Sequence, residues 1–320
     1  MITLLSLVRR SCAGVAALVL LACAAADQVP FPARPITLVV PYPPGGSADI
    51  LARLVGKQLG HRLGQVVIVE NKGGAGTEIG AKAVADAAPN GYTLLLGTVS
   101  SQAIHPAMTR VGYDPIRDFV TVSPLASIPF VLVANPAAPM HSFAELIAQA
   151  RAAPGTVAYA SAGTGTSNHL AGEMLASAAG IKLLHVPYRG SAPALADVLA
   201  DHVPLMFDLQ STAVPNIRSG KLRALAVTST QRSPLLPGVP TVSESGFPGY
   251  EVSAWFGVFA PAGTPQSVVD ALSTACAAIL RSPEMQKHLH DLGADPDLRS
   301  REAFDVYVHS EVTRYAGLIH

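Results

Sequence analysis

The chain has 320 residues, with 22 basic and 22 acidic side chains, so its formal net charge at pH 7 is zero. This balance gives no reason to expect binding to nucleic acid or to an anionic membrane surface. The length suffices for two domains of ordinary size. Cys276 is the only cysteine after residue 23, so no disulfide is expected in the rest of the chain.

The first 26 residues have the pattern of a secretory signal peptide. Arg9 and Arg10 precede an uncharged stretch over residues 11–26, which ends in three alanines. This stretch is shorter than the roughly 20 apolar residues that span a bilayer. The pattern predicts export, with cleavage before Asp27. The alternative is a lipoprotein, because "LLAC" resembles a lipobox that would make Cys23 the lipidated first residue.

Short apolar runs alternate with helical patterns in the first third of the chain. The runs at 36–40, 66–70 and 93–97 predict buried strands, since they are apolar without alternation. Residues 47–60 and 77–87 lie between these runs and predict helices with one apolar face. Repeated strand, helix and strand predict a mainly parallel sheet covered on both faces.

A second series of the same kind begins near residue 130. Ser142 and Glu145 have the spacing of a capping box at the start of its first helix. The segments 157–160, 183–186, 204–207 and 222–227 predict its further strands, with helices between them. A third region starts at Trp255 and returns to a strand followed by helices. The sequence therefore predicts two α/β domains, residues 27–127 plus 251–320 and residues 128–250, between which the chain crosses twice.

Three loops share one construction: each ends a predicted strand, contains glycine and a hydroxyl residue, and opens a helix. They are Pro41–Asp49, Ser161–Glu173 and Val186–Asp197, with Ser47, Ser167 and Ser191 expected as N-caps. The first amides of a helix lack internal partners and carry partial positive charge, and glycine allows a ligand to approach them. In open α/β sheets, ligands bind at the carboxyl ends of the strands. The loops predict a carboxylate or phosphate site, with the amides of residues 45–48 facing the acid; a purely structural role is the alternative.

Other motifs leave alternatives open. Residues 73–82, "GGAGTEIGAK", match neither a nucleotide P-loop nor a dinucleotide fingerprint, so they predict a turn that opens a helix at the edge of the cleft. His169 and Glu173 stand four residues apart without a third ligand nearby, which favours a polar or capping role over a metal site. Asp208 follows a strand and either binds an amino or hydroxyl group of a ligand or caps a helix that begins near Ser211.

Arg189, Trp255 and the serines of the loops each need a separate interpretation. Arg189 either pairs with a carboxylate or is solvated, and Trp255 is expected to pack in the core or hinge. A hydrolase that used Ser47 or Ser167 would need a general base nearby, for which His169 is the one evident candidate.

The motifs together resemble one family. The segments that carry the resemblance are "RPITLVVPYPPGGSADILARLV", "GQVVIVENKGGAGTEIGA", "PNGYTLLLGT", "YASAGTGTSNHLAGE", "HVPYRGSAPAL", "LMFD", "GKLRALAVTS" and "VSAWFGVFAPAGTP". In this order they are similar to the Bug family, the periplasmic solute receptors of tripartite tricarboxylate transporters. The resemblance runs from about Arg34 to the last helix.

The resemblance implies a two-domain periplasmic binding fold of the Venus-flytrap, type II-like kind, without catalysis. It implies an organic acid held between the domains, with one carboxylate bound by backbone amides and ordered waters. Matching positions imply a set of ligand-binding residues: Tyr42, Gly46, Ser47, Ala48, Thr98, Ser100, Gly163, Thr166, Ser167, His169, Tyr188, Gly190 and Asp208.

The functional expectation is a periplasmic receptor that delivers a small mono- or dicarboxylate to membrane permease subunits. It is expected to act as a monomer, without a metal, a cofactor or a nucleic-acid partner. A receptor with the same fold that senses its acid for a two-component signalling partner is the alternative.

Overall fold

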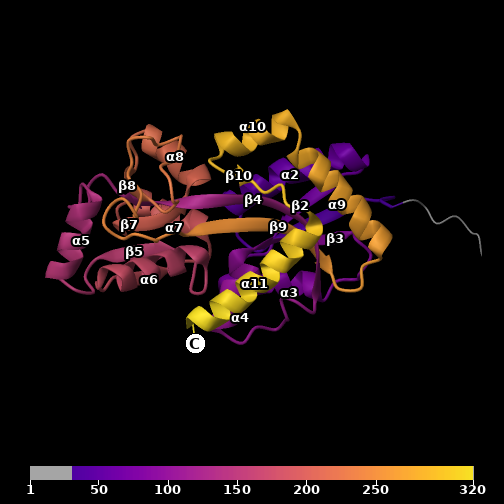
Figure 1. The fold of residues 1–320 in the computed structure, drawn as a ribbon, viewed down its shortest axis with the longest axis horizontal. Coiled ribbons are helices and arrows are strands. Elements are labelled where there is room, and N and C mark those ends of the chain that lie inside the picture. Colours follow the sequence, from indigo (N-terminus) through magenta and orange to yellow (C-terminus); the bar gives the residue numbers. More distant parts are fainter. Residues whose placement is uncertain (1–30, 320) are drawn as a thin grey trace, which may run out of the picture. The chain divides into compact units, whose positions relative to one another are not determined.

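Figure 1 shows a computed structural model of the chain, which describes residues 31–319. The predicted signal peptide over residues 1–26, with Cys23, lies outside the described residues. The chain divides into two compact units, Met1–Ala33 and Arg34–His320. Only residues 31–33 of the first unit are described, so the strands and helices below all belong to the second.

The strands of the second unit form one mixed sheet with the order β2-β1-β3-β9-β4-β7-β5-β6, and β8 and β10 pair with β4. Their bounds are β1 (Ile36–Val40), β2 (Val67–Asn71), β3 (Thr93–Thr98), β4 (Phe119–Ala134), β5 (Ala158–Ser161), β6 (Leu184–Pro187), β7 (Leu205–Leu209), β8 (Arg223–Val227), β9 (Ser253–Pro261) and β10 (Asp295–Pro296). The three predicted early strands are therefore present, and β1 and β3 are mostly buried as expected. The expectation of a buried strand is wrong for β2, which lies at the edge of the sheet and has no buried residue.

The expectation of a mainly parallel sheet is wrong for the centre. The pairs β1–β2, β1–β3, β5–β6 and β5–β7 are parallel, but every pair that includes β4 or β9 is antiparallel. The cause is the path of the chain, because β4 leads out of the first series and β9 returns to it in the opposite direction. Figure 1 shows these two long strands running through the middle of the sheet.

Helices cover the sheet. They are α2 (Ser47–Leu63), α3 (Glu78–Ala85), α4 (His105–Met108), α5 (Phe143–Ala152), α6 (Ser167–Ala179), α7 (Ser191–Leu199), α8 (Gln210–Arg218), α9 (Gln266–Leu280), α10 (Pro283–Asp291) and α11 (Arg301–Ile319), with a 3₁₀ turn η1 (Ala75–Thr77) and a π-helical turn η2 (Ser100–Ile104). Among the described residues, no helix is long and apolar enough to cross a membrane.

The predicted capping box at the start of α5 is present. Ser142 is the N-cap, and its hydroxyl accepts a hydrogen bond from the amide of Glu145 at 3.2 Å. The carboxylate of Glu145 accepts in turn from the amide of His141 at 2.7 Å. The Glu145 amide of the helix start is thus satisfied by the cap, whereas the return bond of the Glu145 carboxylate goes to the residue before the N-cap.

Strand β4 changes partners along its length. Its first part, from Phe119 to Pro129, pairs with β9, whereas the part from Phe130 to Ala134 pairs with β7 and β8. We call residues 34–129 and 253–319 the first lobe, and residues 130–252 the second lobe. The predicted domain boundaries, after residues 127 and 250, fall close to these points. That the lobes behave as separate domains stays a prediction.

Apolar side chains fill both lobes. In the second lobe, Val131 and Met206 of the sheet pack with Val198 of α7 and Val214 of α8 in one buried cluster. In the first lobe, Trp255 is 3% exposed, and its indole N–H donates to Glu311 of α11 at 3.1 Å. The expectation that Trp255 packs in the core is therefore confirmed.

Candidate functional site

Three helices from the two lobes begin without a side-chain cap: α2 in the first lobe, and α6 and α7 in the second. Their N-caps are Gly46, Thr166 and Gly190, whereas the expected caps, Ser47, Ser167 and Ser191, are the first residues of the helices. The prediction of serine N-caps is wrong by one position. An N-cap takes a non-helical conformation, and here the preceding residue takes it, so each serine joins its helix.

The first turns of these helices border one small cavity, which we call the inner cavity. Its volume is about 30 Å³, room for about one or two water molecules. It is lined by Tyr42, Ala48, Thr98, Phe130, Ala162, Ser167, Asn168, Ser191, Leu209, Ala254 and Phe256. Residues from both lobes and from all three helix starts thus meet at one point.

Several lining residues were missed in the sequence analysis. Phe130, Leu209 and Phe256 lie in strands β4, β7 and β9. Apolar residues in a strand look like ordinary core residues in the sequence. Asn168 follows Ser167 in a loop that the sequence did single out, and its side-chain amide donates to the carbonyl of Phe207 at 3.3 Å. Asn168 is the second residue of α6, and this place in the first turn of a helix is the signal that could have identified it.

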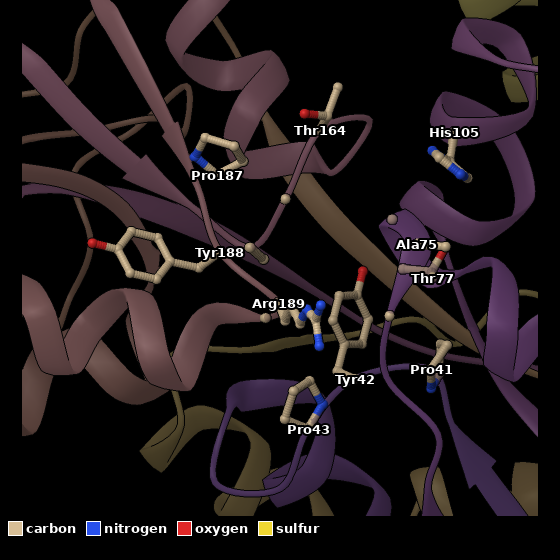
Figure 2. A pocket seen from close by; sticks show the side chains of 15 residues that line it. Pro41, Tyr42, Pro43, Ala75, Thr77, His105, Thr164, Pro187, Tyr188 and Arg189 are labelled. Carbon is tan, nitrogen blue, oxygen red and sulfur yellow. The ribbon is translucent and has the colours of Figure 1, made fainter.

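A larger outer cavity of about 360 Å³ opens beside the inner one (Figure 2). It is lined by Pro41, Tyr42, Pro43, Gly74, Ala75, Gly76, Thr77, His105, Ala162, Gly163, Thr164, Pro187, Tyr188, Arg189 and Gly190. Tyr42 and Ala162 border both cavities. The Tyr42 hydroxyl lies 3.3 Å from the hydroxyl of Thr98, and burial raises the pKa of Tyr42.

Hydroxyl groups join the lobes next to the inner cavity. Ser211 donates to the hydroxyl of Ser47 at 2.6 Å, and the Thr212 hydroxyl lies 3.2 Å from the same oxygen. On the other side, the amide of Ser167 donates to the hydroxyl of Ser100 at 3.0 Å, and Ser100 donates to the Ser167 hydroxyl at 3.3 Å. The lobes are therefore in direct contact around this cavity.

The loop before α2 offers fewer amides than expected. The Gly45 amide donates to the carboxylate of Asp49 at 3.0 Å, so the prediction that this amide faces a ligand is wrong. The same carboxylate forms an ion pair with Arg53 at 2.9 Å. The amides of Ser47 and Ala48 remain at the uncapped start of the helix.

Two expected ligand residues of the second lobe instead support their own loop. The Thr166 hydroxyl donates to the carbonyl of Gly163 at 2.6 Å. His169 accepts from the amide of Gly165 at 3.4 Å, and its ring lies 4.1 Å from that of His185, centroid to centroid. Burial lowers the pKa of His169, which favours the neutral ring that this acceptor role requires. Neither Thr166 nor His169 lines a cavity.

His169 lies close to Glu173, the residue four positions further along its helix. Its Nε2 lies 3.9 Å from Glu173. In the described part of the chain, no group of three metal-ligating side chains is present. Its Nδ1 accepts from the Gly165 amide, and no hydrogen bond within residues 31–319 joins His169 to the hydroxyl of Ser47 or Ser167. The geometry therefore gives neither hydroxyl the base that a hydrolase needs.

Gly163, Tyr188 and Gly190 all border the outer cavity. The Tyr188 hydroxyl donates to Asp197 at 2.6 Å, and Figure 2 shows its ring pointing away from Tyr42. The hydroxyl of Tyr188 is therefore already used, and its ring is held on the side away from Tyr42.

Asp208 lies in β7 and is 1% exposed. It does not cap α8, whose N-cap is Leu209 without a side-chain bond, so that alternative is wrong. Neither carboxylate oxygen accepts a hydrogen bond of ordinary geometry among the described residues. Burial raises the pKa of Asp208 to about 7, and the nearby Thr212 hydroxyl and Leu209 amide oppose this only in part. Asp208 lines neither cavity, and neither do Gly46, Ser47 and Ser100.

The cross-lobe contact of Ser100 gives a first prediction. Replacing Ser100 with alanine leaves the buried Ser167 amide without its acceptor, which costs about 1–3 kcal/mol. We expect the melting temperature to fall by about 2–4 °C for each kcal/mol lost. Ser177→Ala, on an exposed position of the same helix, serves as the control and should melt like the wild type. An unchanged melting temperature of Ser100→Ala would show that the lobes do not make this contact in solution.

The arrangement described above, two α/β lobes with helix starts facing one junction, defines a class of solute-binding proteins. The family model of the tripartite tricarboxylate transporter family receptor matches residues 51–320. The chain therefore belongs to this family of receptors, as the resemblance to the Bug family predicted, and it is a solute-binding receptor and not an enzyme.

Solved structures with the same fold support this assignment. The periplasmic binding protein BugD is 38% identical, with a TM-score of 0.86 over 90% of this chain and 97% of that one. A Rhodopseudomonas palustris protein solved with adipate is 37% identical, with a TM-score of 0.85 over 90% and 98%. MatC from R. palustris, with bound malate, is 33% identical, with a TM-score of 0.86 over 91% and 100%. The fold is therefore that of the periplasmic binding proteins, as predicted.

Proposed function

We propose that this protein is a periplasmic receptor that captures a small mono- or dicarboxylic acid between its two lobes. We propose further that it delivers the acid to membrane permease subunits of a tripartite transporter. One observation carries the proposal: three uncapped helix starts, contributed by both lobes, border a single small cavity. The two similar R. palustris proteins were solved with adipate and with malate, which are both carboxylic acids.

The chemistry of the inner cavity suits one carboxylate. Each helix start carries a partial positive charge of about half a unit, together with amides that have no acceptor in the helix. A carboxylate supplies the negative charge and an acceptor for those amides that have none, whereas the first amide of α6, that of Ser167, already donates to Ser100. Because α2 belongs to one lobe and α6 and α7 to the other, a carboxylate held there would bond to both lobes. Binding would then favour the arrangement in which the lobes are in contact.

The residues in the proposed site have different tasks. Ala48, Thr98 and Ser167 border the inner cavity, and Tyr42 borders both cavities. Gly46, Ser47 and Ser100 act at the junction between the lobes, where Ser47 and Ser100 make the cross-lobe hydrogen bonds. Gly163, Tyr188 and Gly190 form the wall of the outer cavity, and Thr166 and His169 hold the loop beside it. Asp208 is buried in β7 near the cross-lobe hydroxyl of Thr212, and a direct contact with an amino or hydroxyl group of the ligand stays a prediction.

The proposed mechanism is a shift of population between separated and joined lobes. A ligand moves such an equilibrium only by binding one state more tightly than the other. Here the difference arises because the amides of α2 and those of α6 and α7 reach the same carboxylate only when the lobes are joined. The strand exchange within β4 and the return segment between β8 and β9 are the places where a hinge would act.

A thermal-shift screen with neutral analogues tests this proposal. The panel contains succinate, malate, adipate, citrate, glutamate and benzoate, each compared with its amide, and simple sugars as a further control. An acid present at 100 times its Kd should stabilise the protein by about 2.7 kcal/mol, whereas its amide should have little effect. Shifts that are equal for an acid and its amide, or that occur with sugars alone, would contradict the proposal.

A further inference from the structure

His105 is a buried side chain at the junction of the lobes to which the proposed function assigns no role. It is the first residue of α4 and is 8% exposed. Both ring nitrogens are buried, and neither has a hydrogen-bond partner among the described residues. We propose that His105 is a positioning residue for lobe closure whose ring must be neutral when the lobes are joined, so that binding of an acid releases a proton from it. This proposal rests on the proposed function, since it requires that an acid joins the lobes.

One glycine from each lobe makes the space for the His105 ring. A Cβ on Gly76, in η1 of the first lobe, would lie 2.5 Å from Cε1 of the ring. A Cβ on Gly165, in the loop before α6 of the second lobe, would lie 2.4 Å from Nδ1. Figure 2 shows His105 on its first-lobe helix, beside the loop that carries Thr164, the neighbour of Gly165. The cover that Gly165 places over Nδ1 therefore exists only while the lobes are joined.

The backbone ties the ring to the contact between the lobes. The turn η2 ends at His105, whose amide donates to the carbonyl of Ser100. The hydroxyl of Ser100 is the group that accepts from the Ser167 amide across the junction. The Tyr113 hydroxyl donates to the carbonyl of Ser101 and holds the same turn from below. The ring of His105 therefore enters its place as the cross-lobe hydrogen bond of Ser100 forms.

The joined arrangement accepts the neutral ring and excludes the charged one. An imidazolium has two N–H donors, and neither finds an acceptor within residues 31–319. Burial accordingly lowers the pKa of His105 below its ordinary value of 6.5, and the negative charge of Glu78 opposes this only in part. In separated lobes water can supply the missing acceptors, so the ring can be charged there.

The other groups around the ring do not favour its charged form. Arg189 lines the same cavity, where a second positive charge is disfavoured. Helix α11 packs against η2 and α4, but its Glu311 and Arg314 form an ion pair with each other at 3.0 Å. Burial shifts the pKa values of the remaining titratable side chains toward the neutral form: Tyr42, Tyr113, His169 and Tyr315.

The sign of the pH dependence follows from these two states. Below pH 6.5 the ring in separated lobes is mostly protonated, and the proton must leave before the lobes can join. The affinity for an acid should therefore be highest above the ordinary pKa and should fall as the pH decreases. For a single histidine, the fall between pH 7.5 and pH 5.5 is at most about tenfold.

Titration calorimetry of wild type and His105→Asn with the strongest acid of the screen tests this inference. At pH 6, titrations in two buffers with different heats of ionisation give the number of protons released on binding. We expect the wild type to release up to about 0.8 proton more than His105→Asn, because a histidine with an ordinary pKa is about that fraction protonated. The affinity of the wild type should also fall more than that of the variant between pH 7.5 and pH 5.5. Titration of the acid itself or of Asp208 is common to both proteins and cancels in the difference.

His105→Gln is a second neutral variant and should behave like His105→Asn. His61→Asn removes an exposed histidine from the last turn of α2 and is the control, which should release as many protons as the wild type. If no acid of the screen binds to the wild type, the proposed function fails and this inference fails with it. If acids bind but the wild type releases no more protons than the two His105 variants, or takes up more, the role of His105 is overturned while the proposed function stands.

Discussion

Replacing Gly190 with alanine is expected to weaken acid binding about ten- to hundredfold. Gly190 is the N-cap of α7 and has a φ of +125°. A Cβ at this position would lie 2.4 Å from Cδ of Pro43, which belongs to the other lobe. Overpacking of this kind costs about 1–3 kcal/mol, and the cost arises only when the lobes are joined. The variant should therefore fold, but its binding-competent state should be less populated.

The matched control for Gly190→Ala is Gly246→Ala. Gly246 has a φ of +105°, so alanine there carries a similar backbone strain. No heavy atom lies within 4 Å of a Cβ built on it, so the control has no clash. Calorimetric titration of both variants with the strongest acid of the screen separates strain from obstruction. Equal affinities of the two variants would mean that contact between Gly190 and Pro43 is not part of the bound state.

Replacing Asp208 with asparagine is expected to stabilise the protein at pH 8 and to have little effect at pH 4. Burial raises the pKa of Asp208 from 3.8 to about 7, so the folded protein keeps the proton over a range in which the unfolded chain has lost it. A carboxyl group whose pKa is raised by folding makes its full contribution to the free energy of unfolding below pH 3.8. This contribution is lost as the pH rises to about 7. The total change corresponds to about 4 kcal/mol.

Melting curves of wild type and Asp208→Asn between pH 4 and pH 8 test this prediction. The melting temperature of the variant should exceed that of the wild type increasingly as the pH rises, with most of the change between pH 5 and pH 7. Asp201→Asn, an exposed change in the same lobe, should follow the wild type. A difference between Asp208→Asn and wild type that stays constant with pH would show that Asp208 does not titrate in this range.

Much of the fold could be predicted because the signals are local. The strand over residues 36–40 is apolar throughout, and the capping box of Ser142 and Glu145 needs only four consecutive residues. The antiparallel centre was missed, since the directions of β4 and β9 depend on where the chain leaves one lobe and re-enters it. Such long-range pairing leaves no periodic signature in either strand.

The site was predictable in outline but not in detail. The three loops could be recognised because glycine before a hydroxyl residue at a helix start leaves backbone amides open to an anion. The position of each N-cap was wrong by one residue, because the glycine or threonine before each serine takes the cap conformation. His105 and Phe256 gave no signal, since their places at the cavities arise from tertiary packing, and each looks like a core residue in sequence.

The structure of the complex with the acid that binds most tightly in the screen is the most direct test of this account. We expect one carboxylate of the ligand to accept hydrogen bonds from amides at the start of α2 and from amides at the start of α6 or α7. A ligand bound to one lobe alone, or a carboxylate out of reach of all three helix starts, would contradict the account.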